Sequence, residues 1–215
     1  MTERQVFGPS FGEMVLRAQG LACGRGGVVL AEALNFVVAS GRCLLLRGPN
    51  GAGKSTLLLT LAGIVSPLAG GSVLEGTDED AGPQLHYCGH RNALKPRLSV
   101  LENLDFWAAL NGPTGMAAPD ALDRVGLGHI AGLDAGYLSA GQGRRLALAR
   151  LLVSVRPLWL LDEPTAALDV EGHALVTELI DAHLDRGGLV VAATHDPITL
   201  PDLTRMQTLA MGRAR

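Results

Sequence analysis

The glycine-rich segment Gly48–Ser55 constrains the fold of this chain more than any other part of its sequence. It fits the pattern G-x-x-x-x-G-K-[ST], which is typical of a phosphate-binding loop when it joins a strand to a helix. The apolar run Cys43–Leu46 lies one residue before it, and a run with helical character, Ser55–Ala62, follows it. The segment therefore predicts a strand, a loop and a helix in succession, with an anion-binding site at the loop.

The residue types in the loop suit a phosphate group. The glycines let consecutive backbone N–H groups turn toward one point, and the following helix directs its positive end there. Lys54 adds a charge that can reach β- and γ-phosphates, and the Ser55 hydroxyl can bind Mg²⁺. A glycine-rich turn with a surface lysine is the simpler alternative. It is disfavoured because the chain has only two lysines, Lys54 and Lys95, and one of them stands where the pattern requires it.

Hydrophobic periodicity predicts a single α/β domain over residues 1–215. Two strongly apolar runs, Leu158–Leu161 and Leu189–Ala193, indicate buried strands, and a helical segment, Val170–Asp185, lies between them. Strands that alternate with helices in this way predict a parallel sheet.

Two further regions complete the predicted fold. Short strands within residues 13–46, broken by Gly24–Gly27, and another at Gly71–Gly76 indicate a small antiparallel β lobe beside the phosphate loop. Leu85–Cys88 is a further strand. The middle third, about residues 91–150, is expected to form a mostly helical subdomain inserted into the core. Its predicted helices are Ser99–Leu110, Asp120–Val125 and Ala140–Val155.

Charge and hydropathy exclude several classes of protein. The net charge is −3 and no long basic run occurs, which argues against nucleic acid as a partner. No apolar run approaches the ~18 residues that cross a bilayer, and the first 12 residues lack the apolar core of a signal peptide. The three cysteines form no C-x-x-C pair, which indicates reduced thiols. We expect a cytoplasmic chain that keeps some apolar surface for a partner.

Two adjacent carboxylates, Asp162 and Glu163, follow the predicted strand Leu158–Leu161. Because chemistry collects at the carboxyl ends of parallel strands, we expect Asp162 to hold Mg²⁺ near Ser55. Glu163 would point elsewhere and could polarise an attacking water. The alternative is a solvated acidic turn after a core strand, which the phosphate loop disfavours.

A second candidate phosphate contact lies at Leu138–Gln142. Ser139 is expected to cap the helix that follows. The same geometry offers a helix N-terminus, a hydroxyl and the small residue Gly141, all suited to a γ-phosphate. Because one nucleotide site needs no second phosphate-binding helix end, we expect this one to act on nucleotide held by another copy of the chain.

Five motifs in a fixed order give the chain a resemblance to a known family. They are GPNGAGKST at 48–56, LSAGQ at 138–142, LLDEP at 160–164, ALD at 167–169 and the histidine of Ala193–Asp196. The set resembles the nucleotide-binding subunits of ABC transporters and spans nearly the whole chain. It implies a P-loop ATPase fold, ATP and Mg²⁺ as ligands, and ATP hydrolysis.

The resemblance also implies an assembly and a set of site residues. Two copies would form a head-to-tail dimer with ATP sites at their interface, and closure would move a membrane partner. Glu163 and His195 would be catalytic, and Ser55 and Asp162 would bind the metal. The nucleotide-binding residues would be Gly48, Pro49, Asn50, Gly51, Ala52, Gly53, Lys54, Ser55, Thr56, His90, Ser139, Ala140, Gly141, Gln142 and Asp169. No direct contact with the transported substrate is expected.

Two departures from the family pattern narrow the resemblance. His90 stands where the family usually has a glutamine that senses Mg²⁺ and the membrane partner. The region Leu21–Arg25, where the family usually stacks an aromatic ring on adenine, has no aromatic residue, and the planar Arg25 guanidinium could serve instead.

Gly89-His90, the LSAGQ sequence, the short length and Pro157–Trp159 together resemble one subfamily. It comprises the ATP-binding subunits of the cytochrome c maturation system, or haem exporter ATPases (CcmA type). This implies a CcmB-type permease partner, a peripheral location at the cytoplasmic face of the bacterial inner membrane, and a role in haem export or delivery. A glutamine often follows the histidine in that subfamily, whereas Arg91 stands here.

Other interpretations of the sequence remain open. An ATPase of another small exporter, such as a lipid or peptide exporter, would share every motif. A non-transport ATPase acting on DNA or ribosomes is disfavoured by the single cassette and the acidic charge balance. His86, Cys88 and His90 alternate along a strand and could ligate a metal or haem. We favour instead a core role for His86 and Cys88, with His90 at the nucleotide site.

Overall fold

The computed structural model describes residues 10–77 and 82–212. The prediction about the first 12 residues therefore falls mostly outside the described part. The strands are β1 Val15–Arg25, β2 Val28–Ala39, β3 Cys43–Arg47, β4 Ala69–Glu75, β5 Leu85–Cys88, β6 Leu158–Asp162, β7 Leu189–Ala193 and β8 Met206–Ala210. The α-helices are α1 Lys54–Leu61, α2 Val100–Asn111, α3 Ala118–Arg124, α4 Ala140–Val153 and α5 Val170–Asp185. Short 3₁₀ helices cover Gly128–Ile130, Ala135–Tyr137 and Leu203–Arg205.

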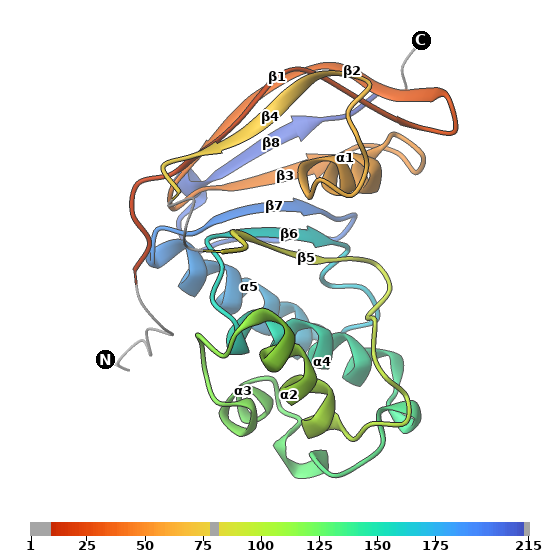
Figure 1. Cartoon of the computed structure of the whole chain (residues 1–215), viewed down its shortest axis with the longest axis vertical. Coiled ribbons are helices and arrows are strands. Elements are labelled where there is room, and N and C mark those ends of the chain that lie inside the picture. Colours follow the sequence, from red (N-terminus) through yellow and green to blue (C-terminus); the bar gives the residue numbers. More distant parts are fainter. Residues whose placement is uncertain (1–9, 78–81, 213–215) are drawn as a thin grey trace.

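These strands form two sheets. A five-stranded sheet has the order β5-β6-β7-β3-β8, and every neighbouring pair in it is parallel. A three-stranded antiparallel sheet has the order β2-β1-β4. Figure 1 shows α1 between the two sheets, and α4 and α5 across the other face of the parallel sheet. The predicted α/β core and small antiparallel lobe are confirmed.

The alternation of side chains along the buried strands divides the core into two parts. In β6, Leu158 and Leu160 join the apolar cluster that contains α1 and the antiparallel sheet. Trp159 and Leu161 join the cluster that contains α4, α5 and the helices beyond them. This period of two is expected of a strand, and β6 and β7 are buried on both faces because helices cover both.

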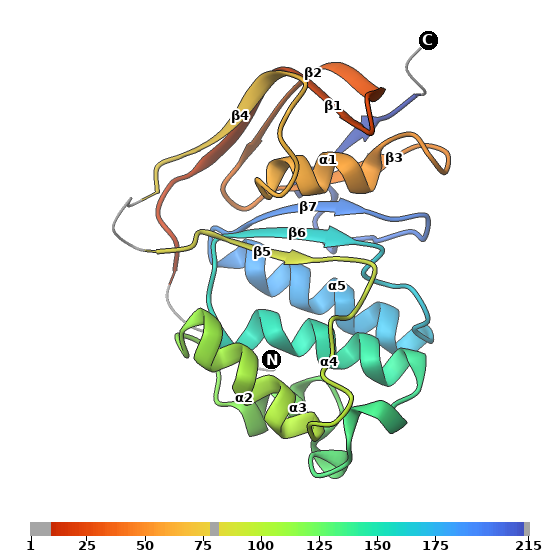
Figure 2. The ribbon, with the colours of Figure 1, turned by 45° about the vertical axis from the view of Figure 1, so that its right-hand side comes forward.

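The helices α2, α3 and α4 form the helical subdomain, which Figure 2 shows below the parallel sheet. Helix α2 begins after Ser99, whose hydroxyl accepts from the Glu102 backbone N–H while the Glu102 carboxylate accepts from the Ser99 N–H. This reciprocal pair satisfies two backbone donors at the helix start. Whether residues 91–150 bound this subdomain within one domain stays a prediction.

Three sequence-based expectations about secondary structure are wrong. Helix α3 begins at Ala118 rather than Asp120, because the first turn of a helix accepts Pro119. Helix α4 ends at Val153, two residues early, because Ser154 adopts an extended conformation. Strand β8 was not predicted. It is the edge strand beside β3, and its exposed Gln207 and Thr208 give it no continuous apolar signal.

His183 on α5 is a fully buried ionisable group in the core beneath the sheet. Its ring stacks on Trp159 with centroids 3.9 Å apart, and its Nε2–H donates to the Pro157 carbonyl over 3.0 Å. Burial lowers the pKa of His183 to about 3, and burial likewise lowers the pKa of His86 to about 4. Both side chains are therefore neutral in the folded chain at neutral pH.

We expect the free energy of unfolding to fall as the pH drops below about 6.5, because the unfolded histidines then take up protons that the folded chain excludes. Each group contributes a slope of up to about 1.4 kcal/mol per pH unit. His183→Phe keeps the ring stack and removes one titration, so its slope should be shallower. Urea unfolding between pH 7.5 and 5 measures this, with exposed His129→Gln as the control. Equal slopes for wild type and His183→Phe would contradict the assignment.

Candidate nucleotide site

Four neighbouring strands bring the predicted site residues to one edge of the parallel sheet. The phosphate loop follows β3, and His90 lies two residues after β5. Asp162 ends β6, and His195 follows β7. A cavity of about 530 Å³, here called the nucleotide cavity, lies at this edge. It is lined by Leu30, Asn50, Gly51, Gly53, Lys54, Ser55, Thr56, His90, Asp162, Glu163, Ala166 and His195.

The phosphate loop has the backbone that its glycines permit. Gly53 has φ 91°, and a Cβ at this position would lie 2.9 Å from the Leu30 Cβ, so the close approach of β2 requires glycine. Helix α1 begins at Lys54, one residue before the predicted start. Its positive end therefore points into the loop, as an anion site needs.

Lys54 is buried, and its ammonium lies at the centre of the site. Nζ donates to the carbonyls of Gly48 over 2.7 Å and Pro49 over 3.2 Å, and it lies 3.3 Å from His195 Nε2. Because the ammonium has donors only, His195 Nε2 is the acceptor of this hydrogen bond. These contacts hold the charge at the mouth of the loop, within reach of a phosphate.

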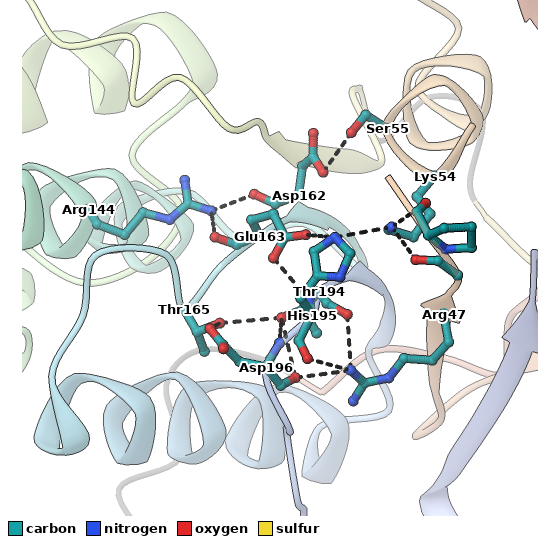
Figure 3. A network of polar contacts seen from close by, with 12 residues as sticks. Arg47, Lys54, Ser55, Arg144, Asp162, Glu163, Thr165, Thr194, His195 and Asp196 are labelled. Carbon is teal, nitrogen blue, oxygen red and sulfur yellow. Dashed lines mark hydrogen bonds and ion pairs between the residues drawn. The ribbon is translucent and has the colours of Figure 1, made fainter. Parts of the chain in front are cut away.

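The two predicted metal ligands are in contact with each other. The Ser55 hydroxyl donates to Asp162 Oδ1 over 3.0 Å, a contact that Figure 3 shows between α1 and β6. Burial raises the pKa of Asp162, and the hydrogen bond from Ser55 opposes that rise. Two neighbouring oxygen ligands fit Mg²⁺, which commonly takes one or two protein ligands together with phosphate and water.

Glu163 lies between β6 and β7 with an uncommon backbone conformation. Its φ is 49°, in the left-handed region, and its N–H donates to the Ala193 carbonyl over 2.7 Å. The carboxylate accepts from the His195 N–H over 3.2 Å, and its Oε1 lies 3.5 Å from His195 Nε2. The side chain lines the nucleotide cavity. Figure 3 shows the His195 ring between the Glu163 carboxylate and Lys54.

Several predicted nucleotide-binding residues do not line this cavity. Gly48, Pro49 and Ala52 belong to the loop but are not among the residues that line the cavity. The segment Ser139–Gln142 lies at the start of α4, and Asp169 lies at the start of α5. Both α4 and α5 thus expose a helix N-terminus outside the cavity of their own chain.

The capping role predicted for Ser139 is confirmed. Its hydroxyl accepts from the Gln142 N–H, and the Gln142 side chain accepts from the Ser139 N–H. Asp169 caps α5 in a similar way by accepting from the Gly172 N–H over 2.8 Å, and it also accepts from Arg145 over 3.1 Å. Asp169 is exposed. The hydrogen bond from the Gly172 N–H, with that from Arg145, lowers the pKa of its carboxyl group.

A second cavity of about 610 Å³, here called the groove, shares Ser55, His90 and Asp162 with the first. The groove extends from these shared residues along β5 to α2 and α4, which contribute Trp107 and Arg150 to its lining. The other lining residues are Arg25, Leu59, Leu85, His86, Tyr87, Cys88, Gly89, Arg91, Ala93, Asn111 and Leu151.

The metal-binding alternative for His86, Cys88 and His90 has no support in this geometry. Strand β5 ends at Cys88, so His90 does not continue its alternation. Cys88 is buried, and the His86 Nε2 contacts the Ser154 carbonyl. Within residues 10–77 and 82–212, no three His, Cys, Asp or Glu side chains gather as metal ligands.

Three residues at the site were not found from the sequence. Leu30, on β2, forms an apolar part of the wall of the nucleotide cavity. Arg25, which the sequence suggested for stacking on adenine, lines the groove and not this cavity. Arg47 donates through Nη1 to the carbonyls of Thr194, His195 and Asp196, at 3.0, 3.2 and 3.2 Å. Arg144 holds the turn after β6 in a comparable way. For Arg47 and Arg144, the signal available in the sequence was a charged residue within an otherwise apolar strand or helix pattern.

Comparison with known proteins identifies the family of this chain. The ABC transporter family model matches residues 31–166. The "Cytochrome c biogenesis ATP-binding export protein CcmA" of Rhodopseudomonas palustris (strain HaA2) is 52% identical over 189 residues, covering 86% of this chain and 94% of that protein. The protein of the same description from Chelativorans sp. (strain BNC1) is 48% identical over 202 residues, covering 93% and 98%.

Solved structures show the same fold at lower identity. A putative ABC transporter ATP-binding protein from Pyrococcus furiosus has a TM-score of 0.78 and 22% identity, covering 92% of this chain and 97% of that one. An ATP-binding cassette solved as a dimer in a post-hydrolysis state with ADP and Pi has a TM-score of 0.74 and 23% identity, with the same coverage. The chain therefore belongs to the ABC transporter family, as an ATP-binding and ATP-hydrolysing subunit most like the cytochrome c biogenesis ATP-binding export proteins.

Proposed function

We propose that this chain binds and hydrolyses ATP for an ABC transporter complex of cytochrome c maturation, at the step of haem export or delivery. The observation that carries the ATPase mechanism is the convergence of Lys54, Glu163 and His195 in one cavity with the Ser55–Asp162 pair. The relatives' names, at about half identity over most of both chains, support the biological role.

In the proposed binding step, the chain surrounds the phosphates of ATP with donors. The loop N–H groups and the positive end of α1 face the cavity, and Lys54 adds a full charge. Ser55 and Asp162 would hold Mg²⁺, which supplies positive charge to phosphate oxygens when it is bound. Formation of that contact would replace the direct Ser55–Asp162 hydrogen bond.

In the proposed hydrolysis step, Glu163 accepts a proton from water. The backbone N–H of His195 donates to the carboxylate and holds it at the cavity. The His195 ring accepts from Lys54, so one residue contacts the base through its backbone and the ammonium through its imidazole. A base oriented in this way raises the rate by proton transfer in the transition state.

The second half of the site would come from another copy of the chain. Ser139, Ala140, Gly141, Gln142 and Asp169 lie outside the nucleotide cavity of their own chain. We propose that the start of α4 completes the cavity of a partner in a head-to-tail dimer, where Ser139 and Gly141 meet the γ-phosphate. Asp169 would then lie between the two sites.

We further propose that a CcmB-type permease docks in the groove, and that the chain is peripheral at the cytoplasmic face of the bacterial inner membrane. The groove shares His90 and Asp162 with the nucleotide cavity, so a segment held there contacts residues that face ATP. In the described part of the chain, no helix has the length and apolar character to cross a membrane. Transported haem would not contact this chain.

Lys54→Ala should weaken ATP binding by about 10- to 100-fold, because it removes a charged hydrogen-bond donor from a buried anion site. Titration with a fluorescent ATP analogue measures this. Lys95→Ala is a matched control, since the only other lysine lies 5.3 Å above the Phe106 ring on α2, away from the cavity. Equal weakening by both substitutions would contradict the role of Lys54.

Mixing Lys54→Ala with Ser139→Arg protein should restore about a quarter of the wild-type ATPase rate, because half of the dimers would keep one intact composite site of two. Mixing Lys54→Ala with Glu163→Gln is the control and should restore nothing, because each composite site then carries one lesion. Recovery in both mixtures, or in neither, would contradict a shared site.

Glu163→Gln keeps the size of the side chain and removes its basicity, so turnover should be abolished apart from a small residual rate while ATP binding persists. In a bacterial host that lacks its own subunit, this variant should leave haem synthesis and b-type cytochromes intact but remove periplasmic c-type cytochromes. Haem staining of separated periplasmic proteins is the measurement. Glu178→Gln, which alters an exposed ion pair with Arg124, is the control.

The outcomes of that experiment separate the alternatives. Normal c-type bands with Glu163→Gln would leave an ATPase of another transporter as the remaining interpretation. Normal hydrolysis by the purified variant would remove Glu163 from the role of base.

A further inference from the structure

Arg144 is a buried arginine in the second turn of α4, with a side chain in contact with three segments of the chain. It is 2% exposed, and all three guanidinium nitrogens donate hydrogen bonds. Nη2 donates to the carbonyls of Asp162 and Glu163, each over 2.7 Å, and Nε donates to the Pro164 carbonyl over 3.2 Å. Nη1 donates to the Gly89 carbonyl over 2.8 Å and to Asn92 Oδ1 over 3.2 Å.

Three consecutive carbonyls that face one guanidinium fix the peptide planes on both sides of Glu163. That residue has φ 49° and precedes a proline, two conditions that disfavour each other in a residue with a side chain. The conformation therefore depends on its surroundings, and Arg144 supplies the largest group of contacts to it (Figure 3). Because Cα geometry sets where the side chain points, these bonds also aim the carboxylate.

The remaining two bonds of Arg144 reach the loop after β5. Gly89 directly precedes His90, which lines both the nucleotide cavity and the groove. One side chain thus ties the start of α4, the turn of Glu163 and the loop of His90 together. The guanidinium contacts backbone oxygens of the turn and leaves both carboxylates, Asp162 and Glu163, free for the cavity.

We infer that Arg144 is a positioning residue for hydrolysis: it holds the turn that aims the Glu163 carboxylate, and it fixes that turn to α4 and to the loop of His90. The inference rests on the proposed role of Glu163 as the base. Lysine cannot replace the guanidinium here, because one ammonium nitrogen cannot place donors at five separated oxygens.

Arg144→Lys should lower kcat for ATP by about 10²-fold, as expected for a misplaced catalytic group, while KM and ATP binding change by less than about twofold. Arg156→Lys is the matched control. Arg156 is also a buried arginine that donates to backbone carbonyls, those of Asn111 and Val155, but it lies at the far end of α4 from the site. It should keep the wild-type kcat.

Arg144→Lys and Arg156→Lys are then made in the Glu163→Gln variant. This comparison distinguishes a role of Arg144 in aiming the Glu163 carboxylate from general support of the fold. If Arg144 acts through Glu163, Arg144→Lys should change the residual hydrolysis rate of Glu163→Gln by less than about twofold. An equal fold-loss in both backgrounds would overturn the inference, and so would loss of ATP binding or of cooperative unfolding in Arg144→Lys. Wild-type kcat in Arg144→Lys would also overturn it. Absence of hydrolysis by the wild-type chain, or normal hydrolysis by Glu163→Gln alone, would instead be a failure of the proposed function.

Discussion

The parallel pairing of β5, β6, β7 and β3 is the constraint on which the rest of the structure depends. In a parallel sheet all carboxyl ends lie at one edge, so the loops that leave these strands must meet there. Four segments distant in sequence, from residue 48 to residue 195, are thereby brought together in the lining of one cavity. No single loop needs to be long, and each site residue follows closely on a rigid strand.

Two arginines then hold the loops at this edge in place. Arg47 contacts three successive carbonyls after β7, and Arg144 contacts three successive carbonyls that begin with Asp162, the last residue of β6. Backbone oxygens are weaker partners than carboxylates. This choice nevertheless leaves the acidic side chains of the site without an internal counter-ion from either arginine, so that they stay available to metal and water.

The parts of the fold that the sequence predicts are those with a local signal. The runs Leu158–Leu161 and Leu189–Ala193 are apolar throughout because both faces of these strands are buried, and the phosphate loop has a residue pattern of its own. The helix Val170–Asp185 was predicted with its observed bounds because its apolar residues repeat at helical spacing. The edge strand β8 lacks such a signal, since polar residues occupy its exposed positions.

The site was predictable in its residues more than in its geometry. Lys54, Asp162, Glu163 and His195 lie together as their motifs indicate. The contacts of Arg144 join residues 18 to 55 positions apart, and no local pattern records such tertiary contacts. The division of the chain between its own cavity and a partner's remains an expectation for Ser139–Gln142 and Asp169.

The left-handed backbone of Glu163 has a consequence for how this chain responds to selection. Such a conformation costs about 1–2 kcal/mol in a residue with a Cβ, and glycine adopts it without that cost. Glu163→Gly would relieve this cost and at the same time remove a carboxylate from the cavity, whereas the other residues with a positive φ, Ala33, Ala93 and Ala167, carry no charged group. A library screened for thermal resistance alone would therefore retain Glu163→Gly although it lacks the proposed base.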